Sequence, residues 1–183
     1  MNNRPLKNTK LNNEILQWQE FLKKHSACES GYLEASDKLP QQWWDMTERP
    51  DWMIWVLKKL PQYKEDKRIW IRIALVCAKE TVHLAKDPQQ RPQKAIEAVE
   101  QWLLDPSEEN RLKCRVVASA AKDYAASAAY ASAASAASAS ASTSASASYA
   151  YASASYAASA VSIRKGICEK IREIIPQLVI GVI

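Results

Sequence analysis

A run of alanine and serine constrains the fold of this chain more than any other feature. The span from Tyr124 to Ile163 carries no charged residue, and residues 138–151 read SASASTSASASYAY. Alanine is the best helix former and a poor strand former, while serine costs a helix roughly a few tenths of a kcal/mol per residue relative to alanine. Strict alternation has the period of a strand, but these propensities favour helix on both sides of it.

The length of the tract predicts a helical hairpin. One unbroken helix from Pro106 to Ile175 would be on the order of 100 Å long, which a chain of this size could not cover on all sides. We therefore expect the chain to reverse within residues 138–148. The apolar stripes expected on the two limbs are Leu112, Val116, Ala120 and Tyr124, then Tyr149, Tyr156, Ile163, Ile167, Ile171 and Ile174.

Prolines and capping residues divide the rest of the chain into helices. Asn12 or Asn13 can cap a first helix, and Asp105 can cap one that begins at Pro106. Further helices are expected from Pro50 and from near Pro92, and a long amphipathic one over 65–85. Pro40 is expected to open a short helical or irregular piece. Three glycines in 183 residues are too few for the turns of a β-barrel or a phosphate-binding loop.

These observations predict an all-α protein: a compact helical bundle with a long Ala/Ser-rich helical hairpin near the C-terminus. We expect a flexible N-terminal segment over 1–12 and a single domain over 13–183. The expected parts of that domain are a Trp-rich helical part, the hairpin and an apolar tail, over 13–105, 106–175 and 176–183.

Charge and cysteine usage indicate a cytoplasmic protein. The formal net charge is +5, but Lys and Arg are spread among nearly as many Asp and Glu, which indicates solubilising charge. Because no binding motif accompanies that charge, we do not expect nucleic acid as a partner. The four cysteines lie far apart without a CxxC pair, as is typical of reduced thiols. The opening segment has no apolar core, and the alanine tract is too polar for a membrane span.

No pattern predicts catalysis, a metal or a cofactor. His25 and Cys28 form an HxxC that cannot complete a zinc site, so we expect a surface histidine beside a buried cysteine. Glu80 and His83 form half of a di-metal motif without a second copy, which favours an ordinary polar pair on a helix. The serines lack a nucleophile turn, and the tryptophans are more typical of a core than of a base-stacking surface.

Four segments of the chain occur in a familiar order. They read FLKKHSACESGYLEA, RPDWMIWVLKKL, IALVCAKETVHL and RPQKAIEAVEQWL, and an alanine-rich region and KIREIIP follow. Together they resemble an alanine-rich helical family of immunity proteins from bacterial polymorphic toxin systems. The resemblance covers Leu16 to Pro176. By position, Asp51, Trp52 and Trp55 match the family's DW-x-x-W segment, and His83 its HL. The RP-x-x-AIE-x-x-E-x-W segment is matched by Arg91, Pro92, Glu97 and Trp102.

The resemblance implies an intracellular all-α protein that neutralises a toxin by binding it, without catalysis. Our leading hypothesis is therefore a non-catalytic inhibitor of a toxin or effector. The candidate partner-binding residues are Asp51, Trp52, Trp55, Arg68, Arg72, His83, Arg91, Tyr130, Tyr149, Tyr151 and Tyr156. One alternative is a structural protein that self-assembles and buries its charge-free face and the apolar tail LVIGVI. A second is a nucleic-acid or nucleotide-binding module, including one used by phage for counter-defence.

Overall fold

The computed structural model of the chain describes residues 5–84, 90–122 and 161–180. Within these ranges the regular secondary structure is helical, without a strand, so the predicted all-α class is confirmed. The Ala/Ser-rich hairpin, its reversal and the stripe positions Tyr124, Tyr149 and Tyr156 lie outside the described residues.

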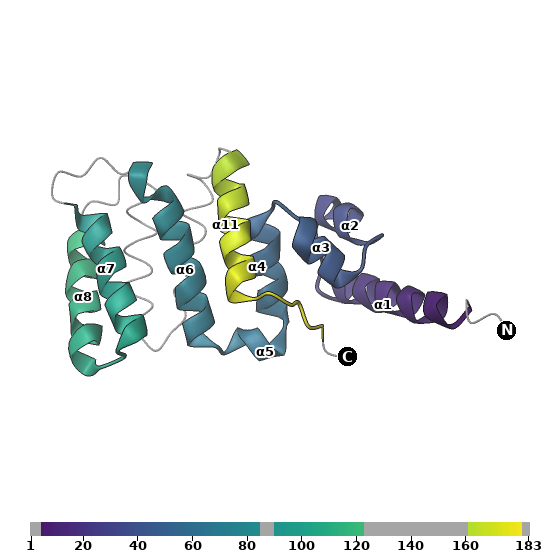
Figure 1. Cartoon of the computed structure of the whole chain (residues 1–183), viewed down its shortest axis with the longest axis horizontal. Helices are drawn as coiled ribbons and strands as arrows, with labels where there is room; N and C mark the ends of the chain where they lie inside the picture. The colour runs from purple at the N-terminus through teal and green to yellow at the C-terminus, as the bar shows by residue number, and fades with distance from the viewer. Residues whose placement is uncertain (1–4, 85–89, 123–160, 181–183) are drawn as a thin grey trace. The chain divides into compact units, whose positions relative to one another are not determined.

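Most of the predicted helices are present (Figure 1). In chain order the elements are α1 (Pro5–Lys24), α2 (Glu29–Ala35), α3 (Pro40–Met46), α4 (Pro50–Lys59), α5 (Pro61–Lys64), α6 (Lys67–Thr81), the 3-10 helix η1 (Val82–Leu84), α7 (Arg91–Leu104), α8 (Glu108–Lys122) and α11 (Val161–Ile174). Proline stands in the first turn of α3, α4 and α7, as predicted, because its fixed φ suits that position and its missing N–H is not needed there. The short α5 has no counterpart in the sequence analysis.

Two predicted helix starts are wrong. Helix α1 begins at Pro5, so the expected cap at Asn12 or Asn13 lies inside the helix, and the boundary drawn between 12 and 13 cuts it. Pro5 supplies the stronger start because it is already in helical φ. Helix α8 begins at Glu108 and not at Pro106. The Ser107 hydroxyl accepts from the Asn110 N–H at 3.4 Å, so Ser107 takes the capping place expected for Asp105.

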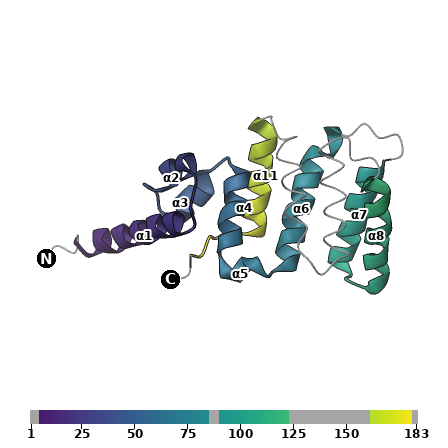
Figure 2. The same cartoon turned by 180° about the vertical axis from the view of Figure 1, so that it is seen from behind.

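The described chain forms two compact units. Unit 1 consists of Met1–Lys64 with Ile175–Ile183, and unit 2 of Glu65–Ile174. The sequence predicts a single domain over 13–183, whose first part ends at 105. That boundary falls in the short connection between α7 and α8, which pack side by side in unit 2 in both views (Figures 1 and 2).

Aromatic rings build the core of unit 1. Trp18 stacks on Phe21 with ring centroids 5.4 Å apart, and it lies 5.5 Å from Trp43. The Trp18 indole N–H donates to the Ala35 carbonyl at 3.0 Å, which ties α1 to the end of α2. Burying a large ring contributes most of the local hydrophobic stabilisation, and the hydrogen bond offsets the cost of burying the indole N–H.

The apolar tail packs on unit 1 through its main chain. The Trp44 indole N–H donates to the Ile175 carbonyl at 3.0 Å, and the Leu178 N–H donates to Gln41 Oε1 at 2.7 Å. The side chains of Ile175 and Leu178 are both buried. Side chains of α3 thus hold an extended segment that follows unit 2 in the chain.

Helix packing in unit 2 corrects the predicted stripe on α8. Leu112 and Val116 are exposed, whereas Cys114 is fully buried and Asn110 nearly so. The Cys114 thiol donates to the Ala98 carbonyl of α7 at 3.3 Å, because small side chains let the two helices approach closely. Asn110 tolerates burial because its amide donates to the Asp105 carbonyl at 2.9 Å. On α11, packed against α6, the expected Ile167 and Ile171 are buried.

Candidate functional site

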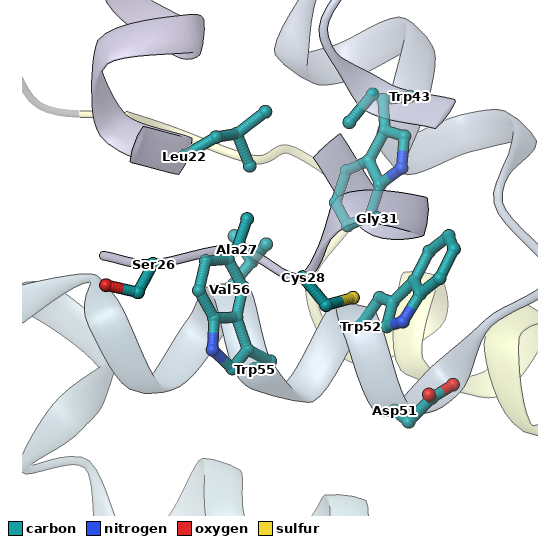
Figure 3. Close-up of a pocket in the computed structure, with 11 residues that line it drawn as sticks. Leu22, Ser26, Ala27, Cys28, Gly31, Trp43, Asp51, Trp52, Trp55 and Val56 are labelled. Carbon is teal, nitrogen blue, oxygen red and sulfur yellow. The ribbon is translucent and has the colours of Figure 1, made fainter. Parts of the chain in front are cut away.

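A cavity of about 290 Å³ lies within unit 1, where the end of α1, the start of α2 and the first turns of α4 meet (Figure 3). We call it the indole pocket because three tryptophans line it. Its lining residues are Leu22, Ser26, Ala27, Cys28, Gly31, Ala35, Trp43, Asp51, Trp52, Trp55 and Val56. A cavity of this size with mostly apolar walls has the features of a binding site for one apolar group.

The lip of the pocket is the C-terminal cap of α1. The Ser26 N–H donates to the Lys23 carbonyl at 3.0 Å, and the Ala27 N–H donates to the Leu22 carbonyl at 2.9 Å. This pair of bonds is a Schellman motif, which requires a residue in the left-handed region. Ser26 has a φ of 59°, where glycine is normally preferred. Backbone strain is therefore located at the edge of the cavity, as is common at binding sites.

Trp52 forms one wall and lies against Arg49 and Gly31. The Arg49 guanidinium lies 4.2 Å from the centroid of the Trp52 ring. The same guanidinium donates to both carboxylate oxygens of Asp51, from Nε at 3.0 Å and from its terminal nitrogen at 2.7 Å. A Cβ on Gly31 would lie 3.6 Å from the Trp52 ring and 3.1 Å from the Cys28 sulfur, so glycine leaves room for both.

The remaining indoles connect the pocket to the core. Trp55 packs edge-on against Phe21, with centroids 6.4 Å apart. Trp43 is buried, and its indole N–H has no hydrogen-bond acceptor among the described residues. An unsatisfied buried donor destabilises the unit, so this group is one that a bound acceptor could stabilise.

Four basic side chains gather beside the pocket, at the C-terminal ends of α1 and α4. We call Lys24, His25, Lys58 and Lys59 the basic cluster. His25 packs on Phe21 at 4.7 Å, and the Lys59 ammonium lies 6.0 Å from the Trp55 ring centroid. None of the four forms an ion pair with a carboxylate of the described residues.

The members of the basic cluster disfavour one another's charge. Partial burial lowers the pKa of His25, and the positive charges of Lys59 and Lys24 lower it further. Partial burial and then the charge of Lys59 lower the pKa of Lys58. Negative charge at the ends of the helix dipoles compensates only part of this repulsion. The cluster cannot be recognised in the sequence because its members come from two separate segments.

The structure brings together only some of the predicted partner-binding residues. Asp51, Trp52 and Trp55 line the indole pocket, whereas Arg68, Arg72, His83 and Arg91 belong to unit 2. Arg72 lines a separate groove between α6 and α11. The candidate tyrosines lie outside the described residues; they are Tyr130, Tyr149, Tyr151 and Tyr156.

The predicted burial of the cysteine in the HxxC segment is wrong. Cys28 is exposed and His25 is half-buried, because the turn after α1 points the Cys28 side chain toward the Trp52 wall and seats the imidazole on Phe21. His83 lies in η1 and not in the helix that carries Glu80. Among the residues that the structure describes, no three side chains are placed to bind a metal. None of the described helices is long and apolar enough to cross a membrane.

Most of unit 2 matches a known protein family. Residues 66–175 match the model of a family of unknown function (DUF6931), and this span covers more than half of the chain. It nearly coincides with unit 2, so the indole pocket lies outside the matched residues. No curated protein and no solved structure matches the chain.

Proposed function

The chain belongs to the family of unknown function DUF6931, and we propose that it is a non-catalytic inhibitor that neutralises a toxin or effector by binding it at the indole pocket. The observation that carries the proposal is the cavity of about 290 Å³ with Trp43, Trp52 and Trp55 in its walls. Tryptophan is enriched at the energetic centres of protein interfaces, where an apolar side chain of one protein fills a pocket of the other.

The wall geometry supports a protein partner over a small cationic ligand. Asp51 is held by both nitrogens of the Arg49 fork, so its charge is already balanced. One face of Trp52 is covered by the same guanidinium, and Lys59 lies over Trp55. A cation would therefore compete with side chains of the chain itself, while the apolar floor remains open to an aliphatic or aromatic side chain.

Binding without catalysis agrees with the chemistry that the pocket offers. Cys28 is the one nucleophilic thiol among the lining residues, and no histidine lines the cavity with it. The resemblance to immunity proteins, whose DW-x-x-W segment corresponds to Asp51, Trp52 and Trp55, supplies the inhibitor part of the proposal. Self-assembly through the apolar tail is less well supported, since Ile175 and Leu178 pack on unit 1 of the same chain.

A pocket-filling variant tests the proposal. In Ala27→Phe a ring would occupy the cavity, while the main-chain bond from Ala27 to Leu22 is kept. Leu33→Phe is the matched control, because Leu33 is exposed on α2 and does not line the pocket. The full-length wild type and both variants are used in affinity pull-downs from a cytoplasmic extract of the native cells. The molar masses of the complexes are then measured by light scattering.

We expect one protein to bind the wild type and Leu33→Phe in a fixed ratio and to be lost from Ala27→Phe. Co-expression should then suppress the toxicity or activity of that protein only when the pocket is open. Equal capture by all three baits would contradict the proposal, and so would an oligomer of the chain that captures nothing.

A further inference from the structure

The basic cluster adjoins the indole pocket in unit 1. His25 directly precedes Ser26 and Ala27 in the pocket lip, and Lys58 and Lys59 follow Trp55 by one turn of α4. Phe21 contacts both the His25 ring and the Trp55 ring, so the two features share a supporting side chain. A ligand that enters the pocket therefore reaches the cluster without crossing another element of the unit.

The repulsion within the cluster is offset only in part by the helix C-termini. Lys24, His25, Lys58 and Lys59 make no ion pair with any carboxylate that the structure describes. Like charges held close together raise the free energy of the unbound protein, and a bound anion relieves that repulsion. The pocket contributes no anion of its own, because the Asp51 carboxylate is occupied by Arg49.

We propose that the partner presents an acidic segment with one apolar side chain, which enters the indole pocket while its carboxylates lie on the basic cluster. This inference rests on the proposed function and specifies the chemistry of the partner. A nucleic acid fits less well, because a base would have to stack on an open face of an aromatic ring. Arg49 already lies over the Trp52 ring and Lys59 over the Trp55 ring. A single side chain needs only the cavity between the rings.

Defined probes test the inference on the full chain. They are an octapeptide with one phenylalanine among seven glutamates, the same peptide with glutamine for glutamate, the same with serine for phenylalanine, and octathymidylate. Binding is measured by calorimetry at low and at physiological salt. The His25 imidazole is followed by NMR, because nearby carboxylates raise its pKa from the lowered value of the free protein.

We expect the glutamate peptide to bind at least tenfold more tightly than the glutamine peptide and to weaken with salt. The double variant Lys24→Gln, Lys59→Gln should remove that preference. The matched control is Lys94→Gln with Lys165→Gln, two exposed lysines of unit 2, which should keep it.

The outcomes separate this inference from the proposed function. Equal binding of the glutamate and glutamine peptides would refute the acidic partner and leave pocket binding intact. Equal binding of the phenylalanine and serine peptides, unaffected by Ala27→Phe, would refute the use of the pocket. Tighter binding of octathymidylate than of any peptide, or no binding of the glutamate peptide, would overturn the inference.

Discussion

Replacing Trp44 by phenylalanine should destabilise unit 1 by about 3 kcal/mol. The side chain is fully buried, and its N–H donates to the carbonyl of Ile175 at 3.0 Å. Losing the donor leaves a buried carbonyl unsatisfied, which costs about 1–3 kcal/mol. The smaller ring also buries roughly 40 Å² less apolar surface, worth about 1 kcal/mol at about 25 cal/mol per Å².

The control is Trp55→Phe, since Trp55 is half-buried and its indole nitrogen makes no hydrogen bond to the described residues. We expect a loss below about 1 kcal/mol for this variant. Urea unfolding gives both free energies of unfolding. Hydrogen exchange of the Leu178 amide, which donates to Gln41, reports whether the tail is released. Equal losses of unfolding free energy in the two variants, or unchanged protection of that amide, would refute the conclusion that the Trp44 hydrogen bond holds the C-terminal segment on unit 1.

Three further predictions concern the neighbourhood of the pocket and the thiols. Ser26→Gly should stabilise the chain by about 0.5 kcal/mol in urea unfolding, because the relief of left-handed strain exceeds the entropy cost of glycine. Cys28 should react with a thiol reagent in the native protein, while burial, which raises the pKa of Cys77 to about 12, should protect Cys77, Cys114 and Cys168 until unfolding. Folding lowers the pKa of His25, so the unfolded chain binds more protons at this group than the folded chain does. The free energy of unfolding therefore falls as the pH drops from above 6.5 to below the lowered pKa. His25→Gln removes this loss, so its effect on the free energy of unfolding should be more stabilising, or less destabilising, at about pH 5 than at about pH 8.

Local signals in the sequence identified most of the helices. Pro40, Pro50 and Pro92 marked true helix starts because a proline in the first turn acts within its own segment. The prediction that Asp105 caps the helix was wrong, because the Ser107 hydroxyl two residues later accepts the Asn110 N–H instead. The side-chain amide of Asn110 engages Asp105.

Contacts between distant segments were not predictable in the same way. On α8 the period is correct, but the buried stripe contains Cys114 and not Leu112, because the small Ala98 on α7 admits close approach there. For the pocket, the DW-x-x-W pattern located Trp52 and Trp55. The lip at Ser26 is formed within one segment, but its position in the pocket and the proximity of Lys24 to Lys59 depend on how α1 meets α4, which no single segment encodes.

The two chain segments of unit 1 have a consequence for biosynthesis. A ribosome makes residues 1–64 first, and Ile175 emerges only after all of unit 2 has been made. During that interval Trp44 cannot donate to the Ile175 carbonyl, and Gln41 cannot accept from the Leu178 N–H. The pocket-bearing unit is therefore completed late, so that a nascent chain interrupted before Ile175 carries an open unit 1 that chaperones and proteases can recognise.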